Sequence, residues 1–168
     1  MVSYANRGAV LEELLEYQHS AYRAAGVADI RKVPTDWHVT KNSASGSAWT
    51  AFPARQSSVD YVGFLMDGGR HVAIEAKQTA RDRWPLAALQ EHQRAYLAAV
   101  DRAGGLAGIA LWWTGRNVLW AVPWPVVVAE MEVSRRSLRF GDLSPLAVRG
   151  GVDYLAALLR ADGGRRCG

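Results

Sequence analysis

The sequence has a single cysteine, and this scarcity restricts the chemistry that the chain can carry. Cys167 is the only cysteine among 168 residues, so neither an intramolecular disulfide nor a cysteine-rich zinc site can form. Long apolar runs are also missing. The longest, Leu119 to Met131, is interrupted by Pro123, Pro125 and Glu130 and is shorter than the roughly 20 residues of a membrane-spanning helix. We therefore expect no membrane span and a chemistry that relies on oxygen and nitrogen ligands.

The first residues, MVSYANRG, lack the basic, apolar and small-residue order of a signal peptide. The expected location is accordingly cytoplasmic. With 49% hydrophobic and 21% charged residues, the composition favours one ordered globular domain over 1–168, with a flexible tail at 162–168.

Lysine is scarce, although the chain is basic. Of 20 basic residues only Lys32, Lys41 and Lys77 are lysine; the others are arginine, and 16 acidic residues leave a net charge of +4. The planar fork of arginine suits phosphate, but the charge excess is small and an arginine bias can also reflect a GC-rich genome. Charge alone therefore leaves nucleic-acid binding open.

Hydrophobic spacing predicts both helices and strands. Two strands, 60–66 and 71–77, form a hairpin whose turn contains Gly68 and Gly69. The polar segment 36–57 is predicted to hold two short strands around a flexible tip, and long segments of this kind are usually functional. Further helices are predicted at 9–25, 86–103, 125–133 and 152–160, and further strands at 106–113 and 117–122.

Two carboxylates and one ammonium are predicted to meet at one end of this hairpin. Glu75 and Lys77 lie on the same face of the second strand because side chains alternate along a strand. Asp60 begins the first strand and lies roughly opposite them. Hydrolysis of a phosphodiester needs hard oxygen ligands for Mg²⁺ and a cation that orients water and offsets phosphoryl charge. The alternative is a solvated edge strand, because an Asp followed by Glu-X-Lys is a permissive pattern.

The order helix, hairpin, helix, with these residues in place, resembles the PD-(D/E)XK nuclease superfamily, and in particular the RecU-type Holliday junction resolvases. The resemblance covers nearly the whole chain. It implies an α/β, restriction-endonuclease-like core: a mixed β-sheet flanked by helices, with a projecting stalk. The matching segments are Asn6-Arg-Gly8, Lys32-Val-Pro-Thr35, Ser57 to Phe64, Glu75-Ala-Lys77 with Thr79, Trp84-Pro-Leu86, Glu91-His-Gln93, Gly104-Gly105 and Val152-Asp-Tyr-Leu155.

The resemblance also implies roles for individual residues. Asp60 and Glu75 would bind the divalent metal together with the backbone carbonyl of Ala76, and Lys77 would be the catalytic lysine. Glu12 would support the metal or its water from the first helix; the alternative is a solvated helix acid. Gln93 would face the site from the second helix; the alternative is a solvated glutamine.

The segment 36–57 matches the stalk that is thought to enter the centre of a four-way junction in this family. Trp49 and Phe52 could stack on unpaired bases or brace the stalk. His71 and His92 are interpreted as structural, and the seven tryptophans mostly as core or dimer surface. The candidate DNA contacts are Arg7, Arg31, Lys32, Lys41, Arg55, Arg81 and Arg83.

The resulting hypothesis is a Mg²⁺-dependent endonuclease, with Mn²⁺ as a substitute, that resolves Holliday junctions in DNA recombination and repair. Paired symmetric nicks would leave 5′-phosphate and 3′-hydroxyl ends, and two cuts imply a homodimer. A branch-migration helicase or a recombinase is a possible partner. The alternatives are another nuclease of the superfamily acting on duplex or flap DNA, and a non-catalytic junction-binding protein.

Overall fold

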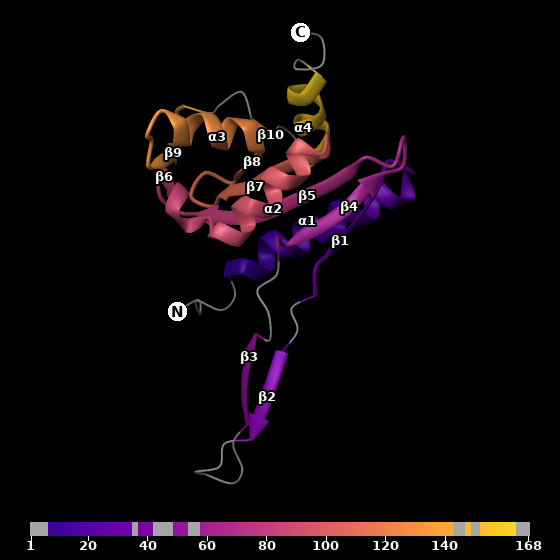
Figure 1. The fold of residues 1–168 in the computed structure, drawn as a ribbon, viewed down its shortest axis with the longest axis vertical. Coiled ribbons are helices and arrows are strands. Elements are labelled where there is room, and N and C mark those ends of the chain that lie inside the picture. Colours follow the sequence, from indigo (N-terminus) through magenta and orange to yellow (C-terminus); the bar gives the residue numbers. More distant parts are fainter. Residues whose placement is uncertain are drawn as a thin grey trace.

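A six-stranded mixed sheet forms the centre of the protein (Figure 1). The computed structural model describes residues 7–34, 37–41, 49–53, 58–142, 147–148 and 152–163. The sheet has the order β1-β4-β5-β7-β8-β10, and only the β5–β7 pairing within it is parallel. Its strands are β1 (Ala28–Lys32), β4 (Tyr61–Leu65), β5 (His71–Thr79), β7 (Leu106–Trp113), β8 (Val118–Pro123) and β10 (Ala147–Val148).

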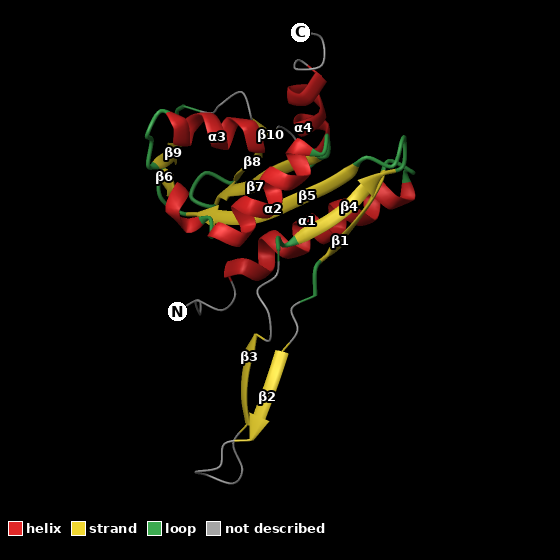
Figure 2. Ribbon diagram, in the orientation of Figure 1, coloured by secondary structure: helices red, strands yellow, loops and turns green. Residues whose placement is uncertain are grey.

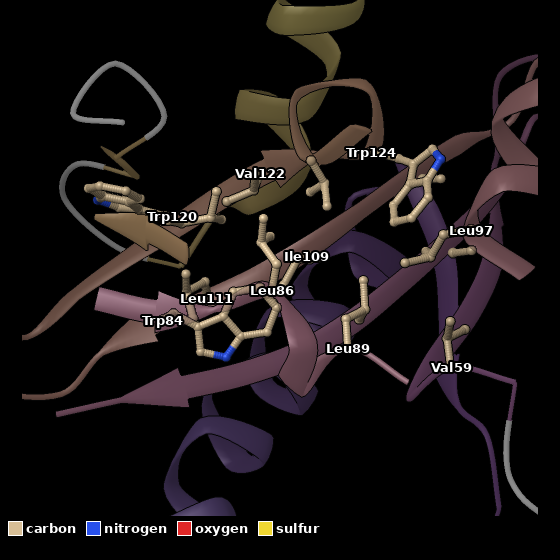
Figure 3. Packing of buried hydrophobic residues seen from close by; sticks show 14 of the residues in the cluster. Val59, Trp84, Leu86, Leu89, Leu97, Ile109, Leu111, Trp120, Val122 and Trp124 are labelled. Atoms are coloured by element: carbon tan, nitrogen blue, oxygen red, sulfur yellow. The ribbon is translucent and has the colours of Figure 1, made fainter. Parts of the chain in front are cut away.

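Helices cover both faces of this sheet (Figure 2). Buried side chains of α1 (Arg7–Ala24) and α4 (Tyr154–Gly163) join one hydrophobic cluster. Those of α2 (Glu91–Arg102) and α3 (Trp124–Glu132) join the other, part of which is shown in Figure 3. The expected mixed sheet flanked by helices is confirmed. Within the described ranges, every helix is too short or too polar to cross a bilayer.

The predicted β4–β5 hairpin is confirmed together with its alternation. Gly68 and Gly69 occupy the turn with φ angles of 73° and 63°, which L side chains rarely adopt. Val72 and Ile74 enter the cluster under α1 and α4, whereas Ala73 enters the cluster under α2 and α3. Glu75 has the same parity as Ala73, so the side chain of Glu75 points toward α2.

A close backbone contact at Gly63 joins the hairpin to β1. In the antiparallel register Gly63 pairs with Ile30. A Cβ atom on Gly63 would lie 2.0 Å from the carbonyl oxygen of Asp29, so no larger residue fits at this position without a shift of the strands. The absence of a side chain thus lets β4 pair with both β1 and β5.

The predicted helix 86–103 was wrong at its start. Residues Leu86–Ala88 form a short 3-10 helix, Leu89 is extended, and α2 begins at Glu91. The side chain of Gln93 accepts a 3.0 Å hydrogen bond from the backbone N–H of Gln90 and thereby satisfies a donor at the start of α2. The interruption allows Leu86 and Leu89 to be buried against the sheet.

The other predicted elements lie within three residues of the observed ones, but several short strands were missed. These are β1, β10 and the small antiparallel sheet of β6 (Arg83–Pro85) and β9 (Ser137–Arg139). The helix α4 extends to Gly163, and the flexible tail expected at 162–168 stays a prediction. The predicted strands of segment 36–57 are confirmed as an antiparallel pair, β2 (Trp37–Lys41) and β3 (Trp49–Pro53), which extends away from the main sheet in Figure 1.

Candidate active site

Asp60 lies where the β4–β5 pairing ends. The register of the two strands stops at Tyr61 opposite Ile74, so β5 continues beyond β4. The Asp60 carboxylate lies in the space next to this extension and accepts a 2.8 Å hydrogen bond from the backbone N–H of Ala76. In a strand, the N–H and C=O of one residue point to the same side. The carbonyl of Ala76 therefore points toward the side where Asp60 lies.

Glu75 is buried and its two carboxylate oxygens have different surroundings. Oε1 lies 2.6 Å from Lys77 Nζ and accepts a 2.6 Å hydrogen bond from Gln93 Nε2. Oε2 is buried and has no hydrogen-bond partner in the part of the chain that the structure describes. Burial, together with the nearby Asp60 charge, raises the pKa of Glu75 to about 7 against the opposing effect of Lys77.

The predicted convergence of Asp60, Glu75 and Lys77 is therefore confirmed as geometry. The side chain of Lys77 is 22% exposed and so connects the buried Glu75 to solvent. Gln93, 9% exposed, reaches Glu75 from α2, as its predicted position facing the site requires. The functional roles of these residues remain predictions.

Glu12 is not brought into this group. Its carboxylate pairs with Lys32 Nζ at 2.5 Å, and both side chains are about half exposed. Among the described residues, no three His, Cys, Asp or Glu side chains are grouped closely enough to hold a metal ion. Glu12 thus does not join Asp60 and Glu75, and its expected supporting role stays a prediction.

The two carboxylates and the Ala76 carbonyl nonetheless fit a hard divalent cation. An oxygen such as Glu75 Oε2, buried without a donor, is the kind of atom that a cation would satisfy. Carboxylate and carbonyl oxygens are the protein ligands that Mg²⁺ accepts, usually one or two of them with waters completing the shell.

The candidate DNA contacts have varied surroundings. Arg31 donates to the Asp29 carboxylate at 2.6 Å, and Lys32 pairs with Glu12, so both already have acidic partners. Arg81 and Arg83 are exposed. The side chains of Arg7, Lys41, Trp49 and Phe52, and all of Arg55, lie outside what the structure describes.

Two groups interpreted as structural can be checked. His71 lies 3.2 Å from the hydroxyl of Tyr96, in agreement with a structural role, whereas the role of His92 stays a prediction. Four tryptophans, Trp84, Trp113, Trp120 and Trp124, are buried in the core, and Trp112 is half-buried.

Sequence reasoning missed three arginines near β9 that share a cavity with Arg83. The run Ser134-Arg-Arg-Ser-Leu-Arg139 was their only signal in the sequence.

Comparisons with known proteins place the chain in one family. The family model described as Recombination protein U matches residues 6–155. The Holliday junction resolvase RecU of Geobacillus sp. (strain WCH70) is 26% identical over 171 residues, which cover 93% of this chain and 84% of the relative. The RecU resolvase of Bacillus pumilus (strain SAFR-032) is 32% identical over 115 residues, which cover 65% of this chain and 55% of the relative.

One solved structure has the same fold. Hjc, a Holliday junction resolvase from the archaeal hyperthermophile Archaeoglobus fulgidus, superimposes with a TM-score of 0.50 at 16% sequence identity. The match covers 87% of this chain and 98% of Hjc. At this identity the likeness concerns the fold, and it agrees with the restriction-endonuclease-like core expected from the sequence.

Proposed function

Because the chain belongs to the RecU family of recombination proteins, we propose that it is a Holliday junction resolvase. The activity is that of an endonuclease, which cuts two opposed strands of a four-way DNA junction during recombination and repair. Junction shape is recognised chiefly through phosphates, and base sequence contributes little.

The asymmetric environment of Glu75 is the observation that carries this proposal. Two donors hold Oε1, whereas Oε2 is buried and receives no hydrogen bond from any residue that the structure describes. An unsatisfied buried oxygen costs about 1–3 kcal/mol, and more when it is charged. We infer that Asp60, Glu75 and the Ala76 carbonyl hold a divalent cation, Mg²⁺ or in its place Mn²⁺.

When bound there, the metal would act as a Lewis acid toward the phosphodiester and lower the pKa of a water ligand. The protein side chains have distinct tasks. The Lys77 ammonium orients the attacking water and offsets charge on the phosphoryl oxygens. Gln93 is a positioning residue, because it fixes the Glu75 carboxylate through a 2.6 Å hydrogen bond. Cleavage leaves 5′-phosphate and 3′-hydroxyl ends.

Glu12 is a candidate for a supporting role at the same site. Lys32, its ion-pair partner, is opposite Tyr61 in the β1–β4 register, and Tyr61 directly follows Asp60. Glu12 therefore lies at the same end of the β1–β4 strand pair as Asp60. Once its exposed ion pair with Lys32 opens, Glu12 could assist the metal or its water.

Two symmetric cuts need two active sites, so we propose a two-fold homodimer. An exposed apolar stripe on α1 supports a contact between copies. Val10, Leu14 and Tyr17 follow helical spacing and are 45%, 36% and 73% exposed. The β2–β3 hairpin would enter the junction centre, and the candidate contacts Arg7, Arg31, Lys32, Lys41, Arg55, Arg81 and Arg83 would hold the arms. A helicase or recombinase partner and a cytoplasmic location fit such a role.

The test compares nicking of a mobile four-way junction with nicking of duplex, flap and single-stranded DNA, with and without Mg²⁺. Junction-selective, metal-dependent paired nicks are expected. Equal rates on duplex DNA would contradict the resolvase assignment.

The variant Asp60→Asn tests the site itself. It should bind the junction as tightly as the parent protein but lose nicking, because it weakens the metal site. Asp67→Asn is the matched control, since Asp67 is an exposed residue at the other end of the same hairpin. Unchanged nicking by the Asp60 variant would refute the proposed metal site.

A further inference from the structure

A cavity of about 480 Å³ next to the small β6–β9 sheet is lined mainly by arginines. We call it the arginine cavity. Its lining residues are Arg83, Arg135, Arg136, Ser137, Arg139 and Asp142. Among the described residues, the lining contains four guanidinium groups, one carboxylate and one hydroxyl, and no aliphatic or aromatic side chain.

Strand alternation directs two of these arginines to the same side. Arg83 is the antiparallel register partner of Arg139, and the next pair along is Trp84 with Leu138. Trp84 and Leu138 are 3% and 1% exposed and belong to the core. Because successive side chains alternate between faces, Arg83 and Arg139 are directed away from the core and toward solvent.

This arrangement places like charges directly opposite each other, which destabilises a strand pair. Arg135 is neutralised by Glu130 at 3.2 Å and by Asp142 at 3.0 Å. In contrast, no ion pair involves Arg83, Arg136 or Arg139 within the ranges that the structure describes. An anion bound between these three cations would offset their repulsion.

The cavity lies on the side of the molecule toward which the active-site strand runs. β5 carries Glu75 and Lys77 and ends at Thr79, and β6 and β9 lie beyond that end (Figure 2). The hydroxyl of Thr79 donates to the backbone carbonyl of Arg83 at 3.4 Å and so links β6 to the end of β5. A duplex arm leaving the active site in this direction would meet the cavity.

We propose that the arginine cavity binds the phosphodiester backbone of a duplex DNA arm outside the cleavage site, with Arg83, Arg136 and Arg139 as its contacts. The proposal rests on the proposed junction-cutting function. Guanidinium forks bind phosphate oxygens in pairs. An acidic protein partner fits less well, because protein interfaces are centred on apolar or aromatic anchors, and the described residues of the lining include none.

The experiment measures binding of a four-way junction and of a plain duplex over a series of salt concentrations, in EDTA so that no cleavage occurs. The variant is Arg136→Gln with Arg139→Gln. We expect Kd to rise about tenfold near physiological salt, and the slope of log K against log salt to fall in magnitude by about 2, one for each lost phosphate contact. The loss should affect duplex and junction alike, because both contain duplex arms.

The matched control is Arg102→Gln with Arg160→Gln, which removes the same charge from exposed positions on α2 and α4 outside the cavity. A second variant, Arg136→Lys with Arg139→Lys, should keep most of the salt slope because it keeps the charge. An unchanged salt slope and affinity in the glutamine variant would overturn the proposal. If the parent protein itself does not bind the junction, the proposed function fails instead, so the two failures are distinguishable.

Discussion

Gln93 on α2 donates a 2.6 Å hydrogen bond to Glu75 on β5, through the same carboxylate oxygen that Lys77 contacts. A neutral donor and an ammonium thus hold one side of a buried carboxylate, and the other side has no described donor. The pKa of about 7 follows from this burial and from Asp60, against the opposing effect of Lys77. Near neutral pH, Glu75 therefore exchanges its proton readily, and a cation must displace that proton to bind.

The first prediction concerns pH and the stability of the metal-free protein. The pKa of Glu75 is raised from 4.5 in the unfolded chain to about 7 in the fold. Its contribution to the free energy of unfolding is therefore fully present below pH 4.5 and is lost as pH rises through about 7. Glu75→Gln should remove this loss. From pH 5 to pH 8, the free energy of unfolding of the variant should therefore rise by roughly 2–3 kcal/mol relative to that of the parent.

Urea unfolding in EDTA at these two pH values measures the effect. Glu132→Gln is the control, because Glu132 is exposed and should leave the pH dependence unchanged. Parallel pH curves for the parent and for Glu75→Gln would show that the Glu75 pKa is not raised by the fold.

The second prediction concerns Lys77. Replacing it with methionine removes the cation that is proposed to face the phosphoryl group but keeps the length of the side chain. The nicking rate at saturating enzyme should fall about 100- to 1000-fold, as it does when a transition-state donor is removed. Single-turnover cleavage and junction affinity would be measured together. Arg102→Met removes an exposed cation elsewhere, and a comparable loss of nicking in that variant would contradict a specific role for Lys77.

The third prediction tests the contact between β1 and β4. Gly63→Ala places a Cβ atom 2.0 Å from the Asp29 carbonyl oxygen, so the strands must separate. We expect a loss of about 2 kcal/mol or more in the free energy of unfolding. Gly141→Ala is the control, because no atom of the described residues lies within 4 Å of a Cβ there, and its effect should stay within about 0.5 kcal/mol. Equal melting temperatures for the two variants would contradict the close approach.

The fourth prediction concerns the segment between β2 and β3. Deleting 42–47 should reduce the ratio of junction to duplex affinity several-fold while the melting temperature changes little, because the sequence of this segment, Asn-Ser-Ala-Ser-Gly-Ser, contains no large apolar side chain. A Gly-Ser segment of equal length separates the effect of length from that of sequence. A large fall in melting temperature with unchanged selectivity would contradict the stalk hypothesis.

The hairpin and its carboxylates could be predicted from the sequence because they depend on local rules. Strand alternation places Glu75 and Lys77 on one face, and the turn at Gly68 and Gly69 brings Asp60 opposite the end of the second strand. Short strands such as β1 and β6 escaped detection, because three to five residues show little periodicity and their pairing depends on distant partners.

The electrostatic details could not be derived from spacing. The bond from Gln93 to Glu75 requires α2 to pack over β5 in one particular rotation. The start of α2 was misplaced by five residues, so the position of Gln93 in the first turn was not apparent. The arginine cavity was also missed, since Arg83 and Arg139 are far apart in the chain and become neighbours only through the β6–β9 register.

Asp60, Glu75, Lys77 and Gln93 all come from one continuous stretch, residues 60–93, whereas β2, β3 and β9 lie outside it. The residues proposed to cut DNA and the hairpin proposed to select its shape are therefore encoded in separate parts of the gene. If the proposed function holds, changes in the β2–β3 hairpin can alter which branched DNA is cut, and changes around β9 can alter how tightly duplex arms are held, while the carboxylates stay in place.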